Sequence, residues 1–326
     1  MSKTPYSNPP KNGYLCGVKL KGYLMGSIAA ATYGLNPLFA LPLYADGMDA
    51  DSVLFFRYLL AVPAVGAMLL WRRRSFAVAR RDVPMLALMA LMMALSSLLL
   101  FESYNFMDAS IASTLLFVYP LMVAVIMAVF FGERLTPLTV TCIAVALGGI
   151  FLLFKNPDGG TLSPAGTAIV MLSSLSYAAY MIGVNRPRLR AIPTLTLIFY
   201  VLAGGAMLFA CKILASPGAT FTTPRHPAMW LCVAALALLP TVVSFVCTTL
   251  AVQTIGPTPT AILGALEPAT AVMMGVLIFH EELSPRDWLG LALIIAAVSC
   301  VVAGGKITAP LVRFRKLFPS LRRKHN

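Results

Sequence analysis

The residue in this sequence best placed to do chemistry is Glu267, a carboxylate about ten residues into an apolar run of bilayer length. At about 1.5 Å per residue, it would lie roughly 15 Å into a helix that begins near residue 257, close to the centre of a bilayer. A carboxylate at that depth is costly and almost always faces protein or a water-filled cavity. We expect it to bind a substrate amino group or to exchange a proton; the alternative is a hydrogen bond that packs two helices together.

The residue after this carboxylate is Pro268, whose nitrogen cannot donate a hydrogen bond to the carbonyl of Gly264. The sequence therefore predicts that this carbonyl is free to bind water, a side chain or a substrate. Tyr119 and Pro120 repeat the arrangement earlier in the chain, with a hydroxyl in place of the carboxylate. Helix kinks are expected at both prolines and at Pro37.

Other polar side chains at mid-depth are candidates to line a substrate cavity. Tyr33 and Asn36 share one face of the first apolar run by their i, i+3 spacing, as do Tyr177 and Tyr180 in the sixth. Packing in the core is the alternative for each tyrosine. The predicted substrate-binding set is Glu267, Tyr119, Tyr33, Asn36, Tyr177, Tyr180, Ser96 and Ser244.

Arg57 and Glu102 are expected at similar depth, near one end of the second and third apolar runs. An ion pair between them would form a gate at one mouth of the cavity. The alternatives are that Arg57 extends its charge to the membrane interface and that Glu102 marks a helix end.

The sequence shows no catalytic or metal-binding pattern. It has three His and six Cys, and the Cys are scattered without a CxxC pair. His280-Glu281-Glu282 lacks the second His one turn later that a zinc protease needs, and no phosphate-binding or nucleotide-binding loop is present. We expect no catalytic residues, no metal, no cofactor and no enzymatic activity.

The elements that must position these residues are membrane-spanning helices. Hydrophobic residues make up 59% of the 326-residue chain and charged residues only 11%, against about 25% charged in soluble domains. The apolar runs are too long and continuous for barrel strands, so an all-α integral membrane protein is predicted. Ten spans are expected, at about 22–45, 52–71, 83–103, 108–131, 137–154, 164–184, 193–214, 228–252, 257–279 and 286–305.

An internal duplication relates the two halves of the chain. At one constant offset, Pro120, Phe131, Glu133, Leu135 and Pro137 recur as Pro268, Phe279, Glu281, Leu283 and Pro285. Five spans per copy turn the second copy upside down, which gives two inverted five-helix repeats with a substrate site between them. The same offset pairs Ser96 with Ser244. The two Glu-containing loops are expected to shape helix ends, with Thr136 and Ser284 as N-caps.

Lys and Arg set the orientation of the spans. They gather in the N-terminal segment, in the connections at 72–81 and 186–190, and in the tail, so both termini are expected in the cytoplasm. The formal charge of +13 is better explained by basic residues that face anionic lipid headgroups than by binding to a nucleic acid. The expected regions are a segment 1–21, a first repeat 22–154, an external loop 155–163, a second repeat 164–305 and a basic tail 306–326.

The phrases FVYP, FFGERLTP and GALEPATAVMMGVLIFHEELSP resemble the EamA family of the drug/metabolite transporter superfamily. The resemblance implies a ten-helix carrier of the inner membrane that exports amino acids or other small metabolites. The second copy reads His280-Glu281-Glu282 where Gly-Glu-Arg or Gly-Glu-Lys would be commoner, which leaves the glutamate in place.

A secondary transporter that exports small metabolites, most of all neutral or aromatic amino acids, by alternating access is therefore the leading hypothesis. A carrier of organic cations or drugs is the alternative within the same fold. An intramembrane lipid-modifying enzyme and a structural or receptor-like protein are the hypotheses from other classes. Proton antiport and facilitated diffusion both fit the sequence, which does not indicate the oligomeric state.

Overall fold

The computed structural model describes residues 11–103, 106, 115–133, 135–153, 163–215, 221–279, 284–286 and 288–300, and these residues form helices and connections without a strand. The predictions above that concern residues 1–10, 107–114, 154–162, 280–283 and 301–326 lie outside this part of the chain. The helices are α1 (Lys11–Tyr33), α2 (Asn36–Ala45), α3 (Ala50–Trp71), α4 (Val83–Ser103), α6 (Tyr119–Phe131), α7 (Pro137–Leu153), α8 (Pro164–Val184), α9 (Pro187–Arg190), α10 (Thr194–Ala215), α11 (Pro227–Ala237), α12 (Ser244–Ile255), α13 (Pro257–Leu263) and α14 (Leu266–Phe279). A short 3-10 helix at Arg80–Asp82, a π-helical segment at Leu238–Val243 and an apolar helix at Trp288–Cys300 complete them.

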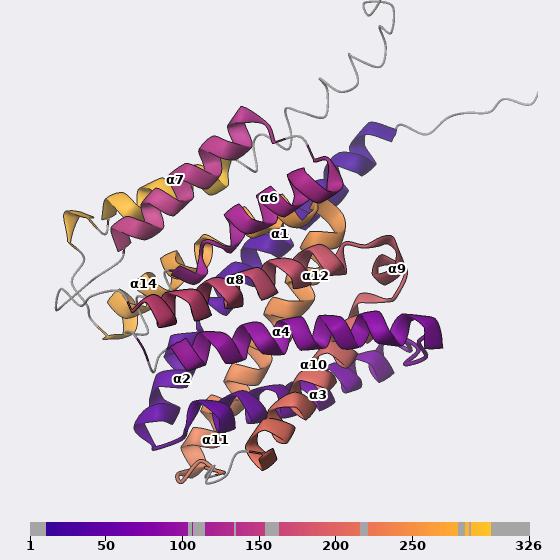
Figure 1. Ribbon diagram of the computed structural model, residues 1–326, viewed down its shortest axis with the longest axis vertical. Coiled ribbons are helices and arrows are strands. Elements are labelled where there is room, and N and C mark those ends of the chain that lie inside the picture. The colour runs from indigo at the N-terminus through magenta and orange to yellow at the C-terminus, as the bar shows by residue number, and fades with distance from the viewer. Residues whose placement is uncertain are drawn as a thin grey trace, which may run out of the picture.

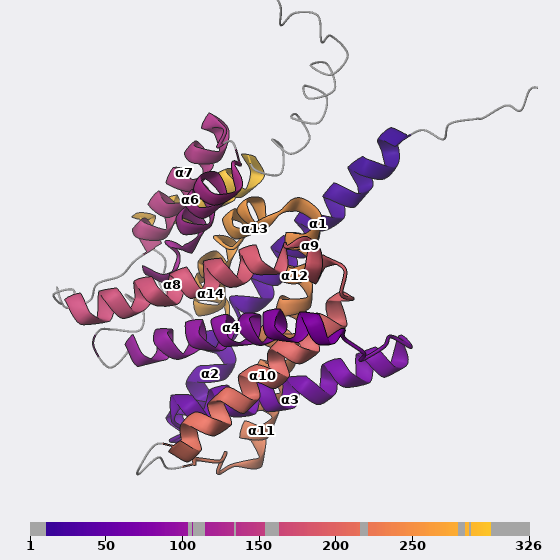
Figure 2. The same ribbon diagram turned by 45° about the vertical axis from the view of Figure 1, so that its right-hand side comes forward.

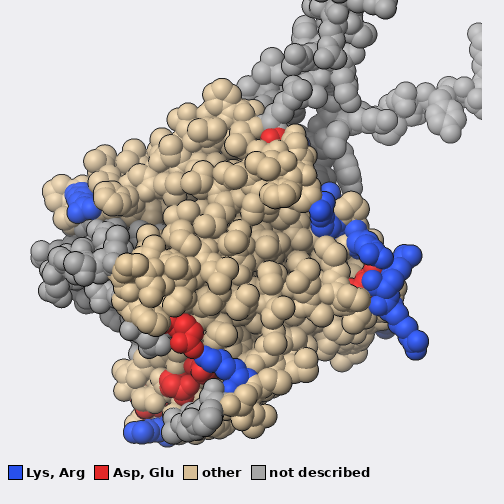
Figure 3. Space-filling model, viewed as in Figure 1, with Lys and Arg blue, Asp and Glu red and all other residues tan. Residues whose placement is uncertain are grey.

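Among the described residues, seven helices are long and apolar enough to cross a bilayer, and α6, α7 and the helix Trp288–Cys300 are shorter apolar helices. Figure 3 shows a broad uncharged band, with Lys, Arg, Asp and Glu gathered toward its margins. This distribution is that of an integral membrane protein. The first predicted span, 22–45, agrees with the candidate span Lys19–Ala45, and α1 itself begins earlier, at Lys11.

Helices from the two halves of the chain pack against one another throughout the bundle. On one side α3 packs against α10, and α4 lies between α10 and α8 (Figures 1 and 2). On the other side α1 packs along α12 and also contacts α14. Each half therefore buries its apolar faces mainly against the other half, which leaves the polar residues of both halves facing a shared interior.

Two of the long helical runs are interrupted near their middle, at Gly34–Leu35 and Gly264–Ala265, and a similar turn at Phe117–Val118 directly precedes α6. The prolines predicted as kinks lie just beyond these turns, in the first turn of α2, α6 and α14. Proline is tolerated there because the first backbone N–H groups of a helix have no partner within it. The interruptions of α6 and α14 stand at nearly equivalent positions in the two halves.

Gly34 brings two of the interrupted helices into contact. A Cβ at this position would lie 2.5 Å from the backbone oxygen of Glu267 and 2.8 Å from Cβ of Thr270. Only glycine leaves room for this approach. The α1–α2 turn is therefore packed directly against the helix that carries the predicted functional carboxylate.

At the end of the bundle where α3 begins, polar side chains join the two halves. Asp49 caps α3, because one carboxylate oxygen accepts a hydrogen bond from the backbone N–H of Ser52 at 3.1 Å. The other oxygen accepts a hydrogen bond from the hydroxyl of Thr222. Thr222 in turn donates its backbone N–H to the hydroxyl of Ser52 at 3.1 Å.

An ion-pair cluster lies at the same end. Lys212, near the end of α10, lies 2.9 Å from a carboxylate oxygen of Asp51 and 2.6 Å from one of Glu102. Because these residues come from α3, α4 and α10, the cluster ties three spans together. All three side chains are partly exposed.

The opposite end of the bundle, where α3 ends, has its own contacts between the halves. The Thr196 hydroxyl donates a hydrogen bond to the carbonyl of Ser75 at 2.9 Å, and the Tyr200 hydroxyl donates one to the carbonyl of Phe76 at 2.9 Å. Both ends are therefore joined in the same way: the start of a span in one half binds a connection of the other half.

Candidate functional site

A cavity between the two halves contains most of the predicted site residues. It leaves about 320 Å³ unfilled, including its open side. Its walls come from α1, α4, α6, α8 and α14 and from the segment before α6, so five helices far apart in the sequence converge on it. The lining residues are Tyr33, Met93, Ser96, Ser97, Leu100, Leu116, Tyr119, Tyr177 and Glu267.

Glu267 is the one carboxylate in the wall of this cavity. It lies in the first turn of α14, is only 9% exposed, and has no hydrogen bond or ion pair from its carboxylate to any residue that the structure describes. The prediction of a free Gly264 carbonyl is wrong, because that carbonyl accepts a hydrogen bond from the backbone N–H of Glu267 at 2.9 Å. Because the chain makes a turn at Gly264–Ala265, this carbonyl has a backbone hydrogen-bond partner within the same turn.

Three tyrosines surround the carboxylate. Tyr33, Tyr119 and Tyr177 line the same cavity as Glu267. The rings of Tyr119 and Tyr177 meet edge to face with centroids 4.8 Å apart. Such rings bind apolar groups and cations, while their hydroxyls donate and accept hydrogen bonds. The site therefore combines one negative group with aromatic walls.

Tyr119 owes its place to a glycine in the opposite half. A Cβ on Gly264 would lie 1.6 Å from the Tyr119 hydroxyl oxygen. The phenol thus lies directly on the backbone of the turn that precedes α14. This contact joins the equivalent interruptions of the two halves at the cavity wall.

One face of α4 supplies four lining residues, of which only Ser96 was predicted. Met93, Ser97 and Leu100 were missed, although their i, i+4, i+7 spacing marks one helix face. Leu116 was missed too, in the segment before Tyr119. Ser97 lies 3.2 Å from the Tyr58 hydroxyl, and the Ser173 hydroxyl of α8 donates to the carbonyl of Ser96 at 2.6 Å.

Three predicted members of the site do not line the cavity. Asn36 shares no helix face with Tyr33, because the turn at Gly34–Leu35 places them on different helices. Tyr180 stacks on Tyr177 with centroids 6.4 Å apart and an interplanar angle of 14°, but it is buried in the core one turn further along α8. Ser244 is buried directly after the π-helical segment, whose wider turn changes the direction in which this position faces.

The predicted ion pair between Arg57 and Glu102 is not formed. Glu102 pairs with Lys212 instead. Arg57 is 5% exposed and donates from Nε to the hydroxyl of Thr241 at 2.5 Å, with its guanidinium 5.4 Å from the centroid of the Tyr33 ring. The π-helical segment that holds Thr241 could not be recognised from the sequence, so this partner was missed.

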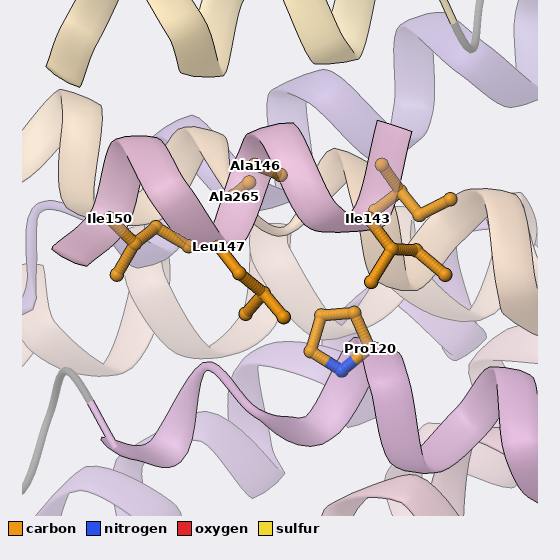
Figure 4. Close-up of a pocket in the computed structure, with 7 residues that line it drawn as sticks. Pro120, Ile143, Ala146, Leu147, Ile150 and Ala265 are labelled. Carbon is orange, nitrogen blue, oxygen red and sulfur yellow. The ribbon is translucent and has the colours of Figure 1, made fainter. Parts of the chain in front are cut away.

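A second, wholly apolar cavity lies behind the interrupted helices. It has about 200 Å³ of space between α6, α7 and α13, its open side included. Figure 4 shows Pro120 facing Ile143 and Leu147, with Ala146, Ile150 and Ala265 around the same space. It contains no polar side chain that could recognise a charged ligand, so it is space beside the turns and not a second candidate site.

Metal-dependent chemistry has no support in the part of the chain that is described. No cluster of three or more His, Cys, Asp or Glu residues there could hold a metal ion. The cavity contains one carboxylate, hydroxyls and apolar groups, a set suited to reversible binding.

The pattern of the two halves also matches a known family. The sequence model described as the EamA-like transporter family matches twice, at residues 20–155 and 164–303. The chain belongs to the EamA-like transporter family. The double match shows that the halves are two copies of one unit. As an EamA-like protein, the chain is a member of a family of membrane transporters.

Curated relatives of this EamA-like chain carry transporter names. The uncharacterized inner membrane transporter YedA of Escherichia coli K12 is 27% identical over 176 residues, which are 53% of this chain and 56% of YedA. The match therefore spans little more than half the length of YedA. The uncharacterized transporter YcbK of Bacillus subtilis is 25% identical over 82% of this chain and 87% of its own. The uncharacterized transporter sll1319 of Synechocystis is 26% identical over 70% of this chain and 66% of its own.

A solved structure shares the fold. A protein whose crystal structure carries no functional description superposes with a TM-score of 0.73 at 20% identity, over 86% of this chain and 96% of the other. At that identity the likeness shows the architecture alone. It supports the arrangement of helices that brings the cavity residues together.

Proposed function

We propose that this EamA-like chain is a secondary transporter that exports small metabolites, most of all neutral or aromatic amino acids, across the inner membrane. The substrate binds in the cavity beside Glu267 and is released by alternating access.

The observation that carries the proposal is the unpaired carboxylate of Glu267. Within the described residues nothing neutralises it, although it is 9% exposed and lies in the middle of a membrane span. Intramembrane carboxylates usually face a partner or a substrate path. A ligand ammonium group would supply the missing positive charge, and the three tyrosines would contact an apolar or aromatic side chain.

The duplication supports alternating access. Ten spans in two copies give an odd number per copy, so the second copy is inverted and both termini lie in the cytoplasm. The contacts at the two ends agree with an inverted pair: Ser52 and Thr222 join the halves at one end, and Tyr200 and Phe76 at the other. If the contacts at one end break while those at the other end remain, the cavity is exposed to one face of the membrane at a time.

A carrier of organic cations is the second candidate, and a specific observation favours it. Tyr33, Tyr119 and Tyr177 line the same cavity as Glu267, and aromatic rings attract quaternary and primary ammonium groups alike. Such a ligand needs no partner for a carboxylate. In either case Glu267 binds the positive group, and coupling to protons or to the substrate gradient alone is compatible with one carboxylate.

Counterflow in proteoliposomes tests the proposal. Vesicles loaded with phenylalanine, leucine, alanine or tetraethylammonium are compared for wild type, Glu267→Gln and Glu133→Gln. Glu133 is a matched control, because it lies beyond α6 and accepts a hydrogen bond from Thr258 at 3.1 Å, away from the cavity. We expect amino-acid flux in wild type and in Glu133→Gln and its loss in Glu267→Gln. Flux of tetraethylammonium alone would favour the second candidate, and flux in Glu267→Gln equal to wild type would exclude Glu267 from binding.

A further inference from the structure

Arg57, which does not itself line the cavity, is a second buried charge without an oppositely charged partner among the described residues. It is 5% exposed, and no carboxylate pairs with it among the residues that the structure describes. A guanidinium keeps its charge in any protein environment and carries five N–H donors. Burying it inside a membrane span without a counter-ion is expensive, which makes such a residue a candidate for function.

The contacts of Arg57 hold it in place without neutralising it. Nε donates to the Thr241 hydroxyl at 2.5 Å and Nη2 donates to the carbonyl of Pro240 at 3.3 Å. Both acceptors belong to the π-helical segment Leu238–Val243, a type of local widening that is frequent at functional sites. Two neutral acceptors orient the guanidinium and leave donors for a further acceptor.

Tyr33 connects Arg57 to the cavity. The guanidinium lies over the Tyr33 ring, with Cζ 5.4 Å from its centroid. Tyr33 also lines the cavity together with Glu267. The side chain under the Arg57 guanidinium of α3 therefore belongs to the same cavity wall as the carboxyl group of α14.

We propose that Arg57 is the anion-binding residue of this cavity and receives the carboxylate of a zwitterionic substrate whose ammonium group binds Glu267. The inference rests on the proposed function and deepens it, because it assigns the second half of the substrate. A zwitterion neutralises both buried charges at once. An amine alone leaves Arg57 unpaired, and a carboxylic acid alone leaves Glu267 unpaired. Tyr33 must turn aside for the ligand to reach both.

The test compares an amino acid with its own fragments. The probes are phenylalanine, phenethylamine and 3-phenylpropionate, together with leucine, isopentylamine and 4-methylpentanoate. Apparent affinities come from thermal protection of the purified protein and from inhibition of counterflow. In wild type we expect each amino acid to bind at least about tenfold more tightly than its amine or its acid, since a charge-assisted hydrogen bond contributes about 10- to 100-fold.

Variants assign the effect to Arg57. Arg57→Gln is expected to weaken amino-acid binding about 10- to 100-fold while amine binding changes less than about threefold. Arg57→Lys keeps the charge and loses the planar fork, so it should recover part of the affinity. Arg190→Gln is the matched control, because Arg190 donates to the carbonyl of Gln253 at 2.5 Å at a partly exposed end of the bundle.

Several results would overturn the inference. One such result needs only the wild-type protein: if an amine binds as tightly as its amino acid, the carboxylate of the amino acid has no partner in the cavity. Equal weakening of amine and amino acid in Arg57→Gln would make Arg57 a structural link between α3 and the π-helical segment. Either result, combined with amino-acid flux in wild type, defeats this inference alone. Absence of any amino-acid flux or binding would defeat the proposed amino-acid function as well.

Discussion

Replacing Gly264 by alanine should disturb the cavity through one steric contact. The new Cβ would lie 1.6 Å from the Tyr119 hydroxyl oxygen and 2.9 Å from the Ala261 carbonyl oxygen. With an ordinary contact of about 3.5 Å, the phenol must retreat by about 1.9 Å. Gly264 has φ −55° and ψ −23°, a conformation that alanine adopts freely, so the cost is overpacking and not backbone strain.

Overpacking of this kind costs about 1–3 kcal/mol of unfolding free energy. For a chain of this size each kcal/mol corresponds to about 2 °C, so Gly264→Ala should lower the Tm by roughly 2–6 °C. Because the displaced ring lines the cavity, amino-acid counterflow should fall as well. Both quantities are measured on the same purified protein, by thermal unfolding in detergent and by flux in proteoliposomes.

A double variant isolates the contact. Tyr119→Phe removes the hydroxyl, after which the closest ring atom, Cζ, is 2.9 Å from the new Cβ. The double variant should therefore regain part of the Tm lost in Gly264→Ala, and the interaction energy follows from the four-variant cycle. Gly148→Ala is the control: no atom lies within 4 Å of its Cβ, so it should be stabilising by about 0.5–1 kcal/mol. A Gly264→Ala protein as stable and active as Gly148→Ala would refute this account of the turn.

Two further predictions concern the end of the bundle where α3 begins. Burial raises the pKa of Asp49, but hydrogen bonds from Thr222 and Ser52 outweigh it and lower that pKa below its ordinary value. Asp49→Ala should therefore cost about 1 kcal/mol above about pH 4, and its Tm deficit should shrink as the pH falls through the folded-state pKa; a deficit that persists at pH 2 would contradict this. Lys212→Gln removes both ion pairs of a partly exposed cluster, so the unfolding free energy should fall by less than about 1 kcal/mol. The loss of Tm should be smaller at high salt, which screens these charges. A loss of Tm that does not depend on salt would show that the ion pairs are not its cause.

Much of the helical framework could be predicted because the bilayer imposes a simple length rule. The spans expected at 52–71, 83–103 and 164–184 agree with α3, α4 and α8 within two residues. The interruptions were less predictable. Gly34–Leu35 divides the first span, whereas the equivalent α8 is continuous, so equivalent positions in the two halves differ in their packing.

The site could be predicted where the signal was chemical and failed where it depended on local helix geometry. Glu267 and Tyr119 stood out as polar residues beside prolines in apolar runs, and both line the cavity. Ser244 was expected there as the equivalent of Ser96, but it follows a π-helical segment that α4 lacks. Such a segment changes the direction in which the following side chains point, and the hydrophobic pattern of the sequence does not reveal it.

Charged partners were the hardest to assign from sequence. Arg57 and Glu102 were matched on estimated depth alone, yet depth along a helix does not determine which face a side chain occupies. Lys212 lies on the neighbouring α10 and reaches Glu102 directly, whereas Arg57 faces the π-helical segment. The correct pairs depend on helix rotation, which packing between the two halves fixes.

The central claim is that the cavity beside Glu267 is reached alternately from both faces of the membrane. Its most direct test is a Ser97→Cys variant, with the six native cysteines replaced, treated with a membrane-impermeant thiol reagent from either side of oriented vesicles. Ser97 lines the cavity and is half-buried. Labelling from both sides, slowed by a transported amino acid, is the predicted result. Labelling from one side only, or at a rate that no transported amino acid changes, would contradict the claim.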